Sequence, residues 1–220
     1  MDYNGRKLVP YIPPNEYDNV ACEFLEQFYP EALKNPTPVP IEIIAKTGLG
    51  LDVQYVCLSE ELDIYGMTIF TDGIVEVYDH DEGLYDTKSF KAKTILIDPE
   101  AVKKTNTGCR NNTIAHECVH WFKHRYYYKM QKFSLPRYAK FCKCHVDQLP
   151  ESTDEENIME SQAIGIAPRI LMPKSTFIEV AEHLGVAYGK DNRSVICDLA
   201  DFFDVSKQSV KIRLEECSLI

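Results

Sequence analysis

The sequence predicts an α+β fold in which a small mixed or antiparallel sheet packs on a helical C-terminal half. Strand-like segments gather between residues 51 and 97, and helical spacing of apolar residues recurs from about residue 112 to the C-terminus. Only two helical segments are expected before the sheet. Strands and helices that are separated along the chain in this way are typical of α+β proteins.

The two helical segments before the sheet differ in length. The first, Asn15 to Tyr29, has an apolar stripe at helical spacing formed by Val20, Phe24, Leu25 and Phe28. Prolines then stiffen the chain up to Pro40, which suits the first position of a short helix over residues 41–47. Gly48 and Gly50 are expected to end this helix.

Four strands are expected from alternation and from turn residues between them: 51–58, 65–70, 74–78 and 94–97. Thr71-Asp72-Gly73 predicts a hairpin turn between the second and third strands. The polar stretch from Asp79 to Lys91 is predicted to be a loop. These strands would form one small sheet ahead of the C-terminal helices.

A metal-binding pattern follows the sheet, in the sequence His116-Glu117-Cys118-Val119-His120. Two histidines four residues apart project from one face of a helix, so both can bind a single ion. The helix is expected at about residues 112–126. Glu117 lies between them and can take a proton from metal-bound water. Cys118 lies about 200° round the helix from His116 and is expected in the core.

The third ligand is expected on a helix that begins near Asp154, since catalytic zinc normally takes three protein ligands. Glu160 shares one face of that helix with Ala163, Ala167 and Leu171. Small residues on this face would let the helix approach the histidine-bearing helix closely enough for Glu160 to reach the ion. The alternatives are Asp154, Glu156 and His145.

His124 extends the histidine series, but it lies a further ~6 Å along the helix axis. It is therefore expected at the cleft rim or in solvent. The sequence does not choose among the candidate donors to a developing oxyanion, which are Tyr126, Tyr127, Tyr128, His124 and Arg169. An edge strand before the histidine-bearing helix is expected to pair with an extended substrate backbone.

The remaining helices are predicted from capping and spacing. Thr153 and Glu156 form a capping box for a helix from about Asp154 to Ala167, which Pro168 would end or kink. Further helices are expected at residues 173–184, 194–203 and 206–217.

Composition narrows the function classes. The net charge of −10 disfavours binding to nucleic acid or to an anionic membrane. No apolar run of signal-peptide or membrane-spanning length is visible, so a cytoplasmic location is expected. The eight cysteines are expected to be reduced thiols. Cys142-Lys143-Cys144-His145 is either a second structural metal site or, preferably, a solvent-side loop with free thiols.

A family resemblance extends over roughly Thr113 to Leu214. The segment from Glu160 through Ala163 to Leu171-Met172-Pro173 resembles the Glu-x-x-Ala…Leu-Met-Pro segment of the ImmA/IrrE metallopeptidases. The segment from Leu199 to Leu214 resembles the closing segment of that family. The linker between His120 and Glu160, which carries the cysteine cluster, departs from the family pattern.

The resemblance implies a zincin-like metalloprotease core, with Zn²⁺ as cofactor and Glu160 as the third ligand. It also implies a zinc-dependent endopeptidase whose protein substrate is a DNA-binding transcriptional repressor of a mobile element or stress regulon. Residues 1–188 are expected to form the metallopeptidase domain, in which residues 1–40 supply the N-terminal helix and the proline-rich connection. Residues 189–220 would form a helical segment, similar to a helix-turn-helix, packed on it.

The alternative function is a transcription-regulatory binding protein with a structural metal, a helix-turn-helix-like tail and little or no proteolysis. From Ser194 to Ile220, however, the tail has five acidic and three basic residues. This balance is poor for binding phosphate, so direct contact with nucleic acid is not expected.

Overall fold

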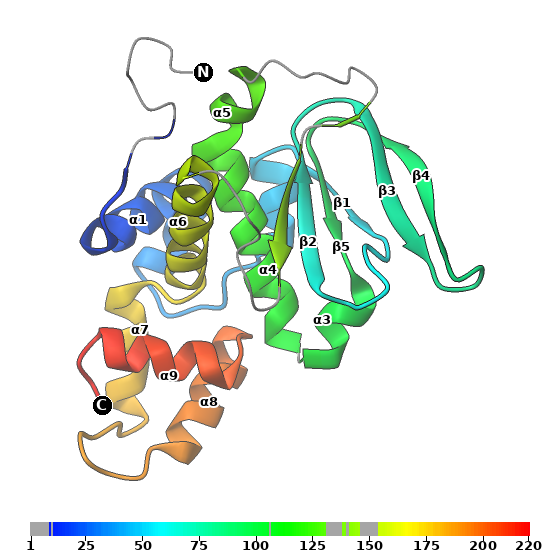
Figure 1. Ribbon diagram of the computed structural model, residues 1–220. Helices are drawn as coiled ribbons and strands as arrows, with labels where there is room; N and C mark the ends of the chain where they lie inside the picture. The colour runs from blue at the N-terminus through cyan, green and yellow to red at the C-terminus, as the bar shows by residue number, and fades with distance from the viewer. Residues whose placement is uncertain (1–8, 10, 106, 131–137, 140, 146–153) are drawn as a thin grey trace.

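The computed structural model describes residues 9, 11–105, 107–130, 138–139, 141–145 and 154–220 (Figure 1). Its main sheet has the strand order β1-β5-β2-β6. β1 and β5 are parallel, whereas β2 is antiparallel to both of its neighbours, β5 and β6. A second sheet is the antiparallel pair β3 and β4. The strand bounds are β1 Asp52–Tyr55, β2 Ile64–Ile69, β3 Gly73–Asp79, β4 Leu84–Phe90, β5 Thr94–Ile97 and β6 Phe141–His145.

The four expected strands are present, but their pairing differs from the prediction. β3 pairs with β4 and not with β2, so residues 70–72 connect two sheets and the hairpin turn predicted at residues 71–73 is wrong. The predicted loop at residues 79–91 is also wrong, because β4 lies within it. All but the last residue of β4 are exposed, which removes the alternation that marks a half-buried strand.

The helices before β6 include both predicted N-terminal segments. α1 spans Tyr17–Phe28, and α2 spans Ile41–Ile43 and continues as a π-turn to Gly48. α3, Pro99–Thr105, was not predicted. Asp98 stabilises its start, since Oδ1 accepts hydrogen bonds from the backbone N–H groups of Glu100 at 3.0 Å and Ala101 at 2.9 Å.

The histidine-bearing helix is longer than predicted. α4 spans Thr107–Val119, continues as a π-turn over His120–His124, and leads into α5, Arg125–Met130. Figure 1 shows α4 between the main sheet and the helices α1 and α6. The helix therefore presents one side to the sheet and the other to a helical layer.

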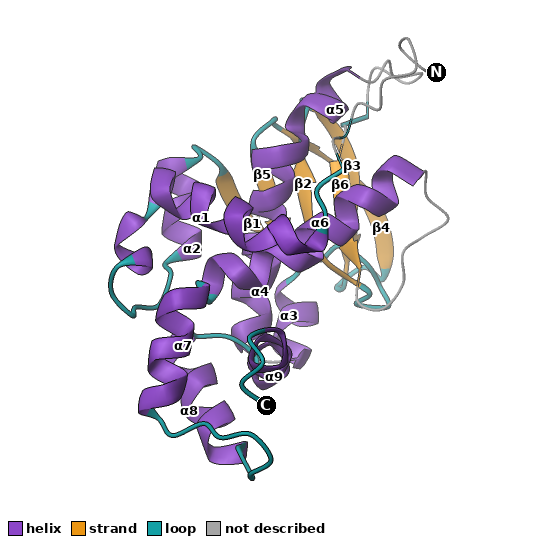
Figure 2. Ribbon diagram, turned by 90° about the vertical axis from the view of Figure 1, so that its left-hand side faces the viewer, coloured by secondary structure: helices purple, strands orange, loops and turns teal. Residues whose placement is uncertain are grey.

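The C-terminal half is helical, as predicted: α6 Asp154–Leu171, α7 Lys174–His183, α8 Arg193–Phe203 and α9 Lys207–Glu216 (Figure 2). The predicted end of α6 at Ala167 is wrong, because the helix passes Pro168. The carbonyl of Pro168 still accepts a hydrogen bond from Met172 N–H at 2.9 Å. The predicted cap, Thr153, lies outside the described residues. None of the described helices has both the length and the apolar character needed to cross a membrane.

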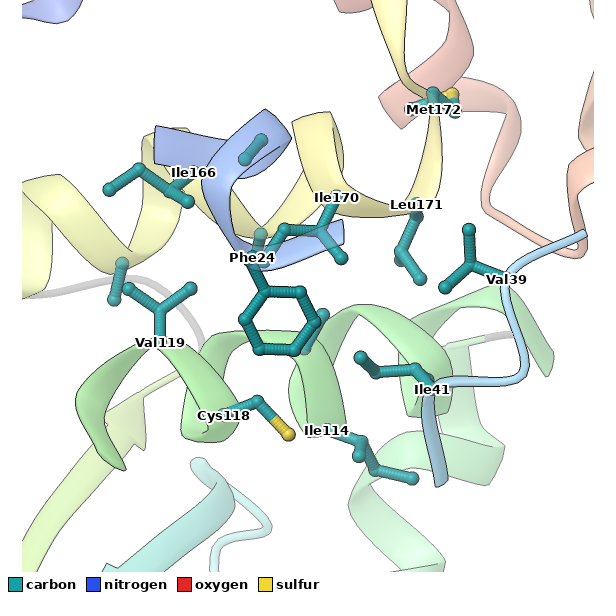
Figure 3. Close-up of a cluster of buried hydrophobic side chains, with 14 of the residues drawn as sticks. Phe24, Val39, Ile41, Ile114, Cys118, Val119, Ile166, Ile170, Leu171 and Met172 are labelled. Atoms are coloured by element: carbon teal, nitrogen blue, oxygen red, sulfur yellow. The ribbon is translucent and has the colours of Figure 1, made fainter. Parts of the chain in front are cut away.

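The core behind α4 joins α1 and α6 to it. Figure 3 shows the Phe24 ring of α1 directed toward Cys118 and Val119 of α4, with Ile166 and Ile170 of α6 beside them. Cys118 is fully buried in this cluster, which confirms its predicted place in the core. This apolar packing fixes the distance between α4 and α6.

The turn between α8 and α9 is held against α4. Asp204 adopts a left-handed conformation at this turn, with φ of 51°. Asn111 of α4 donates hydrogen bonds to the backbone oxygen of Asp204 at 3.0 Å and to the Asp204 carboxylate at 2.8 Å. Gly108 of α4 has no room for a side chain, because an added Cβ would lie 2.1 Å from the carbonyl carbon of Val205.

A buried arginine joins the C-terminal segment to the rest of the fold. Arg213 of α9 is 1% exposed, and its Nε donates a hydrogen bond to the Met172 carbonyl at 3.1 Å. Its other guanidinium nitrogens pair with Asp18 of α1 and, at 3.2 Å, with Glu216. One side chain therefore links the N-terminal helix, the end of α6 and the C-terminal helix.

We expect Arg213→Ala to lower the free energy of unfolding by about 3–5 kcal/mol, because it removes a buried guanidinium that pairs with Asp18 and Glu216 and bonds the Met172 carbonyl. Arg169, whose Nε lies 3.6 Å from Asp18, would still pair with that carboxylate. Water reaches part of Asp18, which favours the lower end of this range. Urea denaturation would measure the loss. The control is Lys211→Ala on the same helix, whose side chain is 63% exposed. A loss no larger than that of the control would contradict the role of Arg213.

Candidate metal centre

His116 and His120 lie on one face of the histidine-bearing helix, as their spacing predicts. His116 belongs to α4, and His120 begins the π-turn that follows. Their Nε2 atoms are 2.9 Å apart, and both residues are buried. Two ring nitrogens therefore point to one place that is shielded from solvent.

Glu160 of α6 reaches the same place. Its Oε2 lies 3.2 Å from His116 Nε2, and its Oε1 lies 3.2 Å from His120 Nε2. Ala163 and Ala167, both fully buried, let α6 approach α4 closely. Burial alone would raise the pKa of Glu160, but the charges and hydrogen bonds of the two histidines lower it below the usual range.

The other candidates for a third ligand do not join this group. Glu156 is described and lies outside it. The side chains of Asp154 and His145 lie outside the described residues. Among the described residues, Glu160 is thus the carboxylate that meets both histidines.

The three donors fit a divalent cation. A tetrahedral ion with bonds of 2.0–2.1 Å holds its donors about 3.3 Å apart. The nitrogen and oxygen atoms here are separated by 2.9 to 3.2 Å. Moreover, a buried carboxylate between two imidazole nitrogens requires positive charge at the point where they meet. Two imidazoles and one carboxylate are a ligand set that metal ions use in hydrolases.

Glu117 lies beside this group and is fully buried. Its Oε2 accepts a hydrogen bond of 2.6 Å from Thr68 Oγ1 on β2, whereas its Oε1 has no hydrogen-bond partner among the described residues. Burial raises the pKa of Glu117, although His116, His120 and Thr68 oppose the shift. One oxygen is therefore fixed, and the other can take part in chemistry.

Gly66 allows β2 to lie close enough to α4 for the hydrogen bond between Thr68 and Glu117. A Cβ at this position would be 2.7 Å from Thr113 Cγ2 and 3.2 Å from Glu117 Oε1. Any side chain here would thus force the strand away from α4. The hydrogen bond from Thr68, two residues further along β2, depends on this close approach.

His124 is buried, so its predicted place at the rim or in solvent is wrong. Its Nδ1 lies 3.1 Å from His120 Nδ1, and its Nε2 lies 2.9 Å from Gln162 Oε1. If His120 Nε2 keeps its lone pair for an ion, His120 Nδ1–H must donate to His124, and His124 Nε2–H must donate to Gln162. Burial lowers the pKa of His124 to about 3, so the ring stays neutral. The hydrogen bonds from His120 to His124 and from His124 to Gln162 require this neutral ring.

Gln162 was not identified from the sequence. The available signal was the histidine series at positions 116, 120 and 124, because a third histidine on the same face is buried with the first two. A buried imidazole needs a partner for its outer nitrogen. Position 162, two residues after Glu160, supplies that partner.

The predicted oxyanion donors are widely spread. Arg169 is paired with Glu216 at 2.9 Å and lies over the Tyr17 ring, so it belongs to the Arg213 network. Tyr126 is 63% exposed. Tyr127 and Tyr128 are buried, and the pKa of Tyr128 is raised by burial and by the nearby Cys142 and Glu160. Tyr128 is thus placed near the metal centre.

The cysteine cluster is not a solvent-side loop, because Phe141–His145 form strand β6. Cys142 is buried, and its Sγ lies 3.8 Å from Glu117 Oε2. Cys144 forms a group with His116 and Glu117 in which the ligand atoms lie within 4.8 Å of one another. The thiols therefore adjoin the centre already described.

Comparison with protein families assigns the chain. The model of the IrrE N-terminal-like domain, peptidase family M78, matches residues 75–215, which is more than half of the chain. The protein belongs to the ImmA/IrrE family of metallopeptidases. This confirms the resemblance inferred from the Glu160–Pro173 segment, and the α+β architecture agrees with a zincin-like core. A search of curated proteins found no match. The family implies a metal cofactor and protein substrates.

We expect Gln162→Leu to weaken metal binding by about 10–100-fold, because it removes the acceptor that fixes the tautomers of His124 and His120. Titration of the metal-free protein with Zn²⁺ in a competing chelator would measure the dissociation constant. Ser161→Ala, at an exposed position of the same helix, is the matched control. Equal zinc affinities in the two variants would argue against a role of the His120–His124–Gln162 hydrogen bonds in metal binding.

Proposed function

We propose that the protein is a zinc endopeptidase in which His116, His120 and Glu160 hold Zn²⁺ and Glu117 is the general base. The observation that carries the proposal is the convergence of these three ligand groups at 2.9 to 3.2 Å beside a buried carboxylate with one free oxygen. Zinc bound by three protein ligands makes water more acidic and polarises a carbonyl group.

Glu117 is suited to proton transfer. Thr68 holds one carboxylate oxygen, so the side chain cannot turn freely, and the second oxygen is available to accept a proton. Burial also raises its pKa toward neutrality, where a general base works best. The proton taken from water would pass to the leaving amine.

The variant Glu117→Gln separates metal binding from proton transfer. We expect it to retain bound zinc and to lose about 10²–10⁴-fold in peptide cleavage, because the amide cannot accept the proton. His116→Ala should instead lose the metal. Metal analysis together with a cleavage assay would test both. Equal cleavage by the wild type and Glu117→Gln would refute the assigned base, and stoichiometric zinc in His116→Ala would refute the ligand set.

Thr68→Val tests the hydrogen bond that positions Glu117. The two side chains have nearly the same shape, but valine removes the hydroxyl donor to Glu117 Oε2, which keeps only the longer contact with Cys142 Sγ at 3.8 Å. Since hydrogen bonds to charged groups contribute about 1.5–3 kcal/mol, we expect kcat/KM to fall by about 10–100-fold. Zinc affinity should not change. Thr68→Ser, which keeps the hydroxyl, should recover most of the activity, and a failure to recover it would indicate a packing effect.

The substrate class follows from the family resemblance, which supports a DNA-binding transcriptional repressor. The net charge of −10 favours a basic partner, such as a protein that contacts DNA. Such a substrate would place the reaction in the cytoplasm. Co-expression of the protein with its substrate repressor should give one discrete cut, and that cut should be absent with Glu117→Gln.

A regulatory protein that binds DNA through α8 and α9 is not favoured. Val210, Arg213 and Leu214 of α9 are buried against the rest of the fold. The turn before α9 is itself bonded to Asn111 of α4. We therefore assign α8 and α9 to packing or to docking of the substrate. Salt-dependent retention of the protein on DNA would reverse this assignment.

A further inference from the structure

A groove lies between α7 and α8, in the C-terminal half of the fold. It encloses about 500 Å³, and the side chains that line it come from both helices, from Leu184 directly after α7 and from Pro36 before α2. Figures 1 and 2 both show α7 and α8 at the end of the molecule away from the strands. The groove is thus a surface of its own, separate from the candidate metal centre on α4 and α6.

The floor of the groove is apolar and rests on the core. Val180 and Leu184, one helical turn apart, are half-buried on the α7 side, and Phe202 of α8 is 37% exposed. The Phe202 ring packs on Phe203 with centroids 4.8 Å apart, and Phe203 packs in turn on Phe177 at 5.6 Å. These packed rings hold Phe202 in place with part of its apolar surface in water.

The rim of the groove is acidic on both sides. Glu179 of α7 and Asp198 of α8 are exposed, and neither forms an ion pair with a described residue. The remaining polar residue at the rim is His183, and none of the described lining residues is a lysine or an arginine. Carboxylates on both walls of an apolar groove produce a negative potential there, which attracts positive charge.

We propose that this groove is a docking site for a basic amphipathic helix of a partner protein. Apolar side chains of such a helix pack on Leu184 and Phe202, and lysines or arginines beside them pair with Glu179 and Asp198. A groove between two helices accepts a helix in this way, whereas an extended peptide binds to the edge of a sheet. A second copy of this chain fits less well, because two chains of net charge −10 repel each other. The site needs neither metal nor catalysis, so it goes beyond the proposed peptidase function.

A synthetic helical peptide measures this binding directly. The probe carries leucines at i, i+3 and i+4 spacing along one face, lysines beside them and a fluorophore at one end. Fluorescence anisotropy gives its dissociation constant with the full-length protein. The control peptides have glutamate in place of each lysine, or alanine in place of each leucine. We expect both to bind about tenfold more weakly or worse, because docking needs the charge and the apolar face together. Equal binding by either control peptide would contradict the proposal.

Charge reversal locates the probe on the protein. The double variant Glu179→Lys/Asp198→Lys should weaken binding by about tenfold or more, since two attractive rim charges become repulsive. The matched control is Glu182→Lys/Asp201→Lys, which changes the net charge equally at exposed positions of the same two helices outside the groove lining. Equal losses in the two double variants would indicate attraction by net charge alone and would overturn the assigned site.

Phe202→Ala tests the apolar part of the site. We expect the probe to bind about tenfold more weakly, because aromatic anchors in a groove contribute much of the binding free energy. Urea denaturation shows whether the variant keeps its fold, and unchanged affinity in the folded variant would overturn the role of the groove. Sedimentation tests the other occupant, since a dimer of the wild type that Phe202→Ala dissociates would assign the groove to a second copy.

The outcomes for the groove and for the metal centre are independent. Glu117→Gln should bind the probe as the wild type does, because the groove shares no residue with the candidate metal centre. Glu179→Lys/Asp198→Lys should bind zinc as the wild type does. Loss of probe binding would therefore leave the proposed peptidase intact, and loss of zinc binding would leave the docking site intact. Weaker probe binding by Glu117→Gln would place the probe at the metal centre and overturn the proposal.

Discussion

The close packing of α4 against α6 determines where every candidate ligand lies. His116 and His120 come from one helical turn and need no other element to meet. Glu160 comes from a separate helix, and it reaches them only because Ala163 and Ala167 keep the two helix axes close. The apolar cluster around Phe24 stabilises this packing from the opposite side (Figure 3). The free energy gained by burying that cluster therefore offsets the cost of burying a carboxylate between two imidazoles.

The second constraint is that the polar groups around the centre are almost all satisfied. The chain from His120 through His124 to Gln162 gives each buried ring a donor and an acceptor. Thr68 does the same for one oxygen of Glu117, and Oε1 of that residue is left without a partner among the described residues. An unpaired buried oxygen costs free energy, so it is retained where chemistry needs it. The hydrogen bonds thus distinguish the proposed ligands, whose side chains are held in place, from the proposed base, whose carboxylate keeps one oxygen without a partner among the described residues.

The sequence was sufficient for features that depend on local periodicity, such as the histidine-bearing helix, the face of α6 that carries Glu160, and strand β5. It was not sufficient for features that depend on pairing between distant segments. β4 has no apolar alternation, because most of its residues are exposed, and β6 is a short strand formed by a segment that was expected to be a solvent-side loop. Each becomes a strand by pairing with a neighbour, β4 with β3 and β6 with β2. The burial of His124 likewise depends on Gln162 from another helix, which spacing along one helix cannot reveal.

The C-terminal helices illustrate why a motif must be judged by its contacts. The segment around Asp204 has the turn and the Ser206 cap of a helix-turn-helix, and Ser206 Oγ accepts a hydrogen bond from Ser209 N–H at 3.0 Å. Yet the turn is packed on Gly108 with no space for even a methyl group, and Asn111 bonds directly to it. The motif therefore holds the start of α4, the helix that carries the proposed metal ligands. The main sheet, with β2 and β6, packs on the other side of α4 (Figure 1).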